Sequence, residues 1–416
     1  MSSGTMTSRE RVLCAMRNGM PDRVPVAPDI SMYVPMRFSG CTSQDFWTGP
    51  KTGIPHWEAY IDAADHYGLD AWTAPVFGLP LVYEESQVEW ERESFVDPAR
   101  DAMVMKATAH TPLGDLQQES VCHRGDQAAV TEKLMKDLAA DFPSFQFLQP
   151  MPRGLDGAAS EAQRRACHDR GHAYGVTVAY PGFQMWNVWL QGGVESLAYV
   201  EADAPELLEQ WLEWDLERGT REMELALSAG LDYILFGGSG TITLASPALA
   251  AKYALPGLAK WSAMAKAAGL PTMLHSCGKN RALADMLADE TDVGMLNPLE
   301  PPPMGDIDLA QVKRAHGSRL AFMGNLHTTD VMLLGTPQDV RRESLKAIRD
   351  AGAGGGFVLS TGDQCGRDTP DANLLEMVAT ARELGAYPLE IDRIEAEIRR
   401  LGEPRPSRTP TARVVT

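Results

Sequence analysis

The sequence lacks the long apolar run that a membrane span requires, and its first residues lack the continuous apolar stretch of a secretory signal. It also lacks a basic run to offset its formal net charge of −18, so phosphate backbones and anionic lipid surfaces would repel it. These absences argue against a membrane protein and against nucleic acid as a partner. They predict a cytoplasmic protein.

Cysteine is scarce, with six residues among 416, which is too few for a disulfide scaffold in a chain of this length. Each cysteine is therefore interpreted as core filler, metal ligand or reactive thiol. For Cys14, Cys41, Cys122 and Cys167 the core interpretation is favoured, because none follows a convincing strand beside other ligand types. No internal repeat or low-complexity tract is present.

From about residue 171 the sequence alternates short apolar runs with longer amphipathic stretches, which is typical of βαβ units and a parallel sheet. Apolar runs upstream at 23–28 and 69–75 bring the number of expected strands to eight. Eight strands with intervening helices predict an α/β fold of the (β/α)₈ TIM barrel class, built as one domain over residues 1–402. The other strands are expected at 173–179, 231–236, 271–275, 293–297, 319–323 and 355–360.

Two segments depart from this alternation. Residues 81–122 alternate apolar and polar positions with Pro and Gly between them, which predicts antiparallel β-hairpins inserted after the second strand. Residues 403–416 are rich in Pro, Thr and Arg with little to bury, which predicts a flexible C-terminal tail.

The strongest chemical signal is LPTMLHSCGKN, in which an apolar strand ends at His275 and Cys277 follows on a glycine-containing turn. Cys365 occupies the corresponding place after a later strand. Because the carboxyl ends of parallel barrel strands meet at one rim, the three side chains could converge there. One imidazole and two thiolates suit Zn²⁺ and leave one coordination position for substrate. The alternative is an ordinary His-X-Cys pair with buried structural thiols.

A carboxylate is the natural companion of such a site, as a proton donor and acceptor or as a displaceable ligand. Glu300 directly follows the expected sixth strand and is the first candidate for this catalytic role, and Asp363 is the second. The alternative for Glu300 is a solvent-facing acid at the start of a helix.

Four further residues are candidates for substrate binding. Asn325 and His327 follow the expected seventh strand and could orient a substrate, although N-capping or loop bracing explains them as well. Tyr180 and Trp186 could wall a planar substrate, although aromatic residues at helical spacing are more often core.

The sequence resembles the uroporphyrinogen decarboxylase superfamily, specifically its branch of zinc-dependent, corrinoid-linked methyltransferases. The resemblance is carried by SRERVLCAMRNGMPDRVPV, by the stretch that contains LHSCGK, by FMGNLHTTDVMLLGTPQDV and by GGGFVLSTGDQCGRDTP. It implies a (β/α)₈ barrel of that family's type, with zinc bound by a His-X-Cys pair and a distant cysteine, which match His275, Cys277 and Cys365. It also implies pairing as a homodimer.

Members of that branch move methyl groups to or from a cobalamin on a separate corrinoid protein. No Asp-X-His-X-X-Gly motif for cobalamin is present here, so the resemblance implies a corrinoid protein as partner. The leading interpretation is O-demethylation, with an aryl methyl ether as the small methylated substrate. In the alternative, zinc activates a thiol that accepts the methyl group from methylcobalamin. The final acceptor, cobalamin, a thiol or tetrahydrofolate, stays open.

Decarboxylation of a porphyrinogen is a second alternative. The family's decarboxylases bind propionates with an arginine-rich loop after the first strand, where this sequence offers only Arg37. They also have an aspartate after the second strand, where this sequence has Phe77 or a neighbouring apolar residue. Both departures disfavour that reaction. A non-catalytic barrel with structural Cys and His residues is the remaining interpretation.

Overall fold

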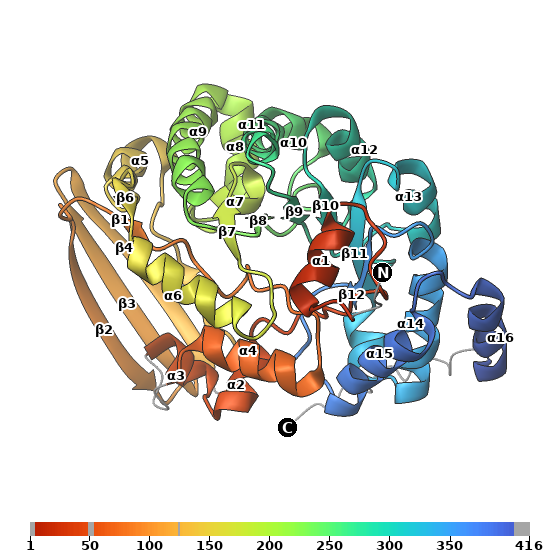
Figure 1. Ribbon diagram of the computed structural model, residues 1–416. Coiled ribbons are helices and arrows are strands. Elements are labelled where there is room, and N and C mark those ends of the chain that lie inside the picture. Colours follow the sequence, from red (N-terminus) through yellow and green to blue (C-terminus); the bar gives the residue numbers. More distant parts are fainter. Residues whose placement is uncertain (1–4, 49–53, 124, 403–416) are drawn as a thin grey trace.

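A six-stranded parallel sheet forms the centre of the molecule in this computed structural model (Figure 1), which describes residues 5–48, 54–123 and 125–402. The tail expected at 403–416 lies outside the described residues. Each strand pairs with the next one along the chain. The strands are β7 (Gly175–Ala179), β8 (Tyr233–Gly237), β9 (Thr272–His275), β10 (Met295–Asn297), β11 (Ala321–Leu326) and β12 (Phe357–Thr361).

The strands are mostly apolar and mostly buried because both faces of the sheet are covered. In β12 every residue is buried. Successive residues alternate between two hydrophobic clusters: Leu235 and Met273 belong to one, whereas Ile234 and Leu274 belong to the other. The predicted strands at 173–360 are therefore confirmed to within three residues at each end.

Both upstream apolar runs also join the parallel pairing. Val26 forms a parallel bridge with Leu359 of β12, and Trp72 forms one with Ala173 just before β7. The two runs thus lie at opposite ends of the six-stranded sheet, where a seventh and an eighth strand would lie.

Helices connect the parallel strands and cover the sheet (Figure 1). Several begin with side-chain caps, such as the Thr336–Asp339 capping box of α14 with Pro337 in its first turn. None of the helices in the described ranges is long and apolar enough to cross a membrane. The helices are α1 (Ser8–Met16), α2 (Tyr33–Ser39), α3 (Ser43–Thr48), α4 (His56–Tyr67), α5 (Leu138–Gln146), α6 (Gly157–His168), α7 (Phe183–Trp186), α8 (Val194–Asp203), α9 (Pro205–Leu227), α10 (Pro247–Tyr253), α11 (Leu255–Ala267), α12 (Arg281–Glu290), α13 (Leu309–His316), α14 (Pro337–Ala351), α15 (Asp371–Leu384) and α16 (Ile391–Leu401).

A four-stranded antiparallel sheet stands to one side of the parallel sheet (Figure 1). It consists of β2 (Glu89–Asp97), β3 (Ala102–Thr111), β4 (Gly114–His123) and β5 (Ala129–Glu132). A short pair, β1 (Leu81–Val82) with β6 (Gly154–Leu155), joins it to the rest of the chain. The antiparallel strands expected at 81–122 are present, and β5 extends them beyond that range. Leu116 of β4 packs in a third hydrophobic cluster with side chains of α5, α7 and α9.

Candidate metal centre

Three potential metal ligands converge at the carboxyl end of the parallel sheet. His275 is the last residue of β9, Cys277 follows it by two residues, and Asp363 follows β12. One ligand atom from each lies within 4.8 Å of the other two. The turn that presents Cys277 requires Gly278, because its φ is +85° and a Cβ there would meet Thr243 Oγ1 at 2.2 Å.

Asn297, the last residue of β10, holds the His275 ring in one orientation. Its Oδ1 lies 2.6 Å from His275 Nδ1, while its own Nδ2 donates to the Met323 carbonyl at 3.2 Å. Because the amide nitrogen is committed to a carbonyl, Oδ1 must accept the hydrogen bond from Nδ1–H. The lone pair of His275 is therefore on Nε2, which lies 3.1 Å from Cys277 Sγ. This is the tautomer that binds a metal through Nε2.

The Cys277 thiol is half-buried, with Ser239 Oγ 3.4 Å from its sulfur. Burial raises the pKa of this thiol far above its ordinary value, and the Asp363 carboxylate adds to the effect. A thiolate there needs a nearby positive charge, which a divalent cation supplies. Imidazole nitrogen, thiolate sulfur and carboxylate oxygen are all ligands that zinc accepts. The donor set therefore fits the predicted zinc ion.

Cys365 lies two residues beyond Asp363 and is buried. Burial raises the pKa of its thiol to about 12, and the neighbouring Asp29 carboxylate contributes. In the described ranges, the one group of three or more ligand types within 4.8 Å contains Asp363 and not Cys365. The structure thus brings His275 and Cys277 together. Cys365 is buried in the hydrophobic core beside Asp29.

Glu300 reaches the same region from the loop after β10. Its Oε2 accepts a hydrogen bond from the backbone N–H of Gly278, directly beside Cys277. Burial raises the pKa of this carboxyl, and the nearby Asp363 charge raises it further. A buried carboxyl with a raised pKa holds its proton to higher pH than an exposed glutamate and is suited to proton transfer.

Sequence reasoning did not find three residues that surround these groups. They are Asn297, the buried Asp29, whose backbone carbonyl accepts from Cys365 N at 2.8 Å, and Trp72, whose ring stacks on His275 at 6.0 Å between centroids. Burial raises the pKa of Asp29, and His275 partly offsets this effect. Asn297 ends an expected strand and Asp29 follows one, so their position at strand ends was an available signal, whereas Trp72 lies within the run at 69–75 and had no such signal.

Tyr180 and Trp186 line one cavity of about 310 Å³ beside the carboxyl end of β7. The Tyr180 hydroxyl hydrogen-bonds to Thr241 Oγ1, and the Thr241 backbone N–H donates to Ser276 Oγ at 3.3 Å. Since Ser276 lies between His275 and Cys277, this chain of contacts joins the cavity wall to the candidate ligands. Trp186 itself is fully buried.

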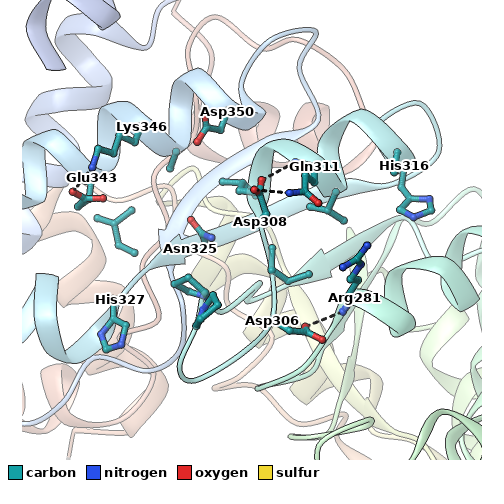
Figure 2. Close-up of a pocket in the computed structure, with 18 of the residues that line it drawn as sticks. Arg281, Asp306, Asp308, Gln311, His316, Asn325, His327, Glu343, Lys346 and Asp350 are labelled. Atoms are coloured by element: carbon teal, nitrogen blue, oxygen red, sulfur yellow. Dashed lines mark hydrogen bonds and ion pairs between the residues drawn. The ribbon is translucent and has the colours of Figure 1, made fainter. Parts of the chain in front are cut away.

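Asn325 and His327 line a different and larger cavity of about 770 Å³, between α13, α14 and the loops after β10 and β11 (Figure 2). Asn325 Nδ2 donates to the Leu299 carbonyl at 3.1 Å. His327 Nδ1 accepts from the backbone N–H groups of Thr329 and Asp330 at 3.2 and 3.0 Å. Asn325 thus braces the loop after β10, and His327 braces the turn that directly follows it. None of the expected metal ligands lines this cavity.

Arg37 and Phe77, the residues at the positions where the decarboxylases differ, both have structural contacts among the described residues. Arg37 is held by the backbone carbonyls of Arg367 and Thr369 and by Asp371. Phe77 is buried and stacks on Trp57 with 5.5 Å between centroids.

The fold and this group of side chains define the protein's class: a parallel α/β fold with a polar, metal-competent centre at the carboxyl ends of its strands. A family model described as uroporphyrinogen decarboxylase (URO-D) matches residues 194–384, which contain β8 to β12. The matched part of the chain, which includes His275, Cys277 and Cys365, agrees with the family resemblance of the sequence.

One solved structure is similar to the chain in fold over most of its length. A methyltransferase from Methanosarcina mazei has a TM-score of 0.62 with 21% identity, over 91% of this chain and 99% of that chain. A D-psicose 3-epimerase from Clostridium cellulolyticum H10 has a TM-score of 0.33 with 11% identity, over 63% of this chain and 84% of that chain. No curated protein sequence matches the chain.

Proposed function

We propose that this protein is a zinc-dependent methyltransferase that moves a methyl group from a small methylated molecule to the cobalamin of a separate corrinoid protein. The observation that carries the proposal is the convergence of His275, Cys277 and Asp363 within 4.8 Å at the carboxyl end of the sheet. The superfamily and the similarity in fold to the Methanosarcina mazei methyltransferase support it. We also propose that the six strands and the two bridged segments form a closed (β/α)₈ barrel, with the antiparallel strands as an insertion after its second strand.

His275 and Cys277 would hold the ion together with the loop after β12. That loop offers Asp363, whose carboxylate is already beside them, and Cys365, the thiol that the resemblance favours. A bound zinc ion would stabilise the negative charge that develops on the leaving atom of the methyl donor. Asn297 keeps the lone pair of His275 Nε2 available to bind a metal. The turn at Gly278 presents Cys277 at the carboxyl end of the sheet.

Glu300 supplies the proton that the leaving group needs. In demethylation of an ether, the bond between methyl carbon and oxygen would break, the methyl group would pass to the reduced corrinoid that the partner would supply as acceptor, and the oxygen would keep the bonding electron pair and take up a proton. The raised pKa of Glu300 keeps its carboxyl protonated at higher pH than an exposed glutamate, so it can donate. The aromatic residues around Tyr180 support an aryl methyl ether as the donor.

The proposal is tested with purified protein by metal analysis and by methyl transfer to free cob(I)alamin, followed by its absorbance. We expect about one zinc ion per chain and transfer from a methoxybenzene derivative. Cys277→Ser should lose both zinc and transfer, and Cys14→Ser, on α1, should keep both. Comparing Asp363→Asn with Cys365→Ser identifies the third ligand by which of them lowers the zinc content. Zinc and transfer retained in Cys277→Ser would contradict the proposal.

A further inference from the structure

The cavity beside β7 carries an excess of acidic groups. Asp215, Arg218 and Glu222 project into it from α9, at positions that share one helix face. Arg218 pairs with Glu222, with 2.6 Å between Nη2 and Oε1. Asp215 Oδ2 accepts a hydrogen bond from Trp186 Nε1 at 2.6 Å. Two carboxylates therefore face one guanidinium, and the guanidinium already has a carboxylate partner.

The surroundings make this excess negative charge costly. Burial raises the pKa of Asp215 to about 7 and also raises the pKa of Glu222, with Arg218 only partly offsetting each. A cation bound in the cavity would stabilise both carboxylates, whereas an anion would add to the repulsion. Arg218 Nε is buried without a hydrogen-bond partner, so the cavity also offers one donor to an oxygen atom of a ligand.

Aromatic rings complete the walls. Trp189 and Trp214 are partly exposed at the cavity, and behind them Trp186 stacks on Trp211 with 5.0 Å between centroids and 19° between planes. Faces of tryptophan rings attract organic cations through the quadrupole of the ring, and the attraction grows when water is excluded. A volume of about 310 Å³ is at the lower end of the range for small-molecule sites.

We propose that this cavity binds a small organic cation, a protonated or alkylated ammonium group, between its tryptophan rings and the carboxylates of Asp215 and Glu222. The cation is the recognition group of the methyl donor, a part of the inference that rests on the proposed methyl transfer. The hydrogen bonds from Tyr180 through Thr241 to Ser276 place the cavity wall next to the candidate ligands. The substrate class thus narrows to aryl methyl ethers that carry a positive charge.

The test compares three ligands of similar size and different charge: 4-methoxybenzylammonium, 4-methoxybenzyl alcohol and 4-methoxybenzoate. Binding to the wild-type, zinc-loaded protein is measured by quenching of tryptophan fluorescence and by calorimetry. We expect the ammonium ligand to bind at least about tenfold more tightly than the alcohol, and the benzoate to bind weakest. Equal affinities, or tightest binding of the benzoate, would overturn the inference.

A variant locates the effect. Asp215→Asn keeps an acceptor for Trp186 Nε1 and removes the charge, so it should reduce the preference for the ammonium ligand about tenfold and leave the alcohol unchanged. Glu217→Gln, an exposed residue of the same helix, should change neither. An equal loss for all three ligands would assign Asp215 a structural role instead. If the ammonium ligand binds but no methyl group reaches cob(I)alamin, the proposed function fails while the cavity assignment stands.

Discussion

At the scale of single residues, the hydrogen bond from His275 to Asn297 carries a testable consequence for metal binding. Asn297→Leu removes the acceptor that fixes the ring and its tautomer, so we expect zinc affinity to fall about tenfold or more. Zinc affinity is measured by competition with a chromophoric chelator. Asn373→Leu is the control, because Asn373 is equally buried and its side-chain Nδ2 donates to the backbone carbonyls of Met332 and Gly335. Unchanged zinc affinity in Asn297→Leu would show that the contact has no role in binding.

Sequence reasoning found the residues of this centre that lie directly after strands in recognisable motifs, and missed those that act through neighbours. His275, Cys277, Glu300 and Asp363 were all named from position, because ligand types after an apolar strand are visible in the sequence. Asn297 was not, because its role depends on the pairing of β10 with β9, which places it opposite His275. Whether Asp363 or Cys365 lies next to His275 and Cys277 depends on the path of one loop, which no local pattern specifies.

At the scale of elements, Asp232 just before β8 ties three segments together. It accepts hydrogen bonds from Arg9 of α1 at 3.0 and 2.6 Å, from His168 of α6 at 2.8 Å and from the Tyr174 backbone at 2.9 Å. Burial alone would raise the pKa of Asp232, but these donors hold it below its ordinary value. The charged carboxylate therefore contributes stability above about pH 4, and the contribution is lost as pH falls through the lowered pKa.

Asp232→Asn should accordingly lower the free energy of unfolding by about 2 kcal/mol at pH 7, a value reduced from that of a fully buried pair because Arg9 is partly exposed. The difference from wild type should shrink towards pH 3. Urea denaturation at several pH values measures both. Asp292→Asn, which removes a more exposed pair with Lys266, should cost less than about 1 kcal/mol. A deficit that stays constant across this pH range would contradict the electrostatic explanation.

The packing of α9 on α11 depends on Gly219. A Cβ at this position would lie 2.1 Å from Cζ2 of Trp261, so the two helices can approach only because the side chain is absent. Gly219→Ala improves helix propensity by about 1 kcal/mol, yet we expect a net destabilisation of about 1–3 kcal/mol from overpacking. Gly157→Ala, at the start of α6 with no atom within 4 Å of the new Cβ, should be neutral or slightly stabilising in the same thermal unfolding measurement.

The strand order of the parallel sheet could be predicted because each βαβ unit leaves its own periodic pattern. The third hydrophobic cluster could not, since it joins β4 to α5, α7 and α9 across more than 90 residues of sequence. Trp186 illustrates the difference, because its spacing in the sequence allowed either a pocket or a core position. In the structure it is buried in that cluster and also lines the cavity.

At the scale of the whole molecule, the separate clusters predict that the antiparallel sheet unfolds independently of the parallel sheet. Leu116 is buried in the third cluster, so Leu116→Ala should cost about 2–4 kcal/mol there and speed amide hydrogen exchange in β2 to β5. Exchange in β8 to β10 should stay slow, because those strands are held by the other two clusters. Leu296→Ala, in β10, should instead speed amide hydrogen exchange in β8 to β10 and leave exchange in β2 to β5 unchanged. If both variants accelerate exchange equally throughout the chain, the clusters act as one cooperative unit, and loss of packing around the cavity would then reach the metal centre as well.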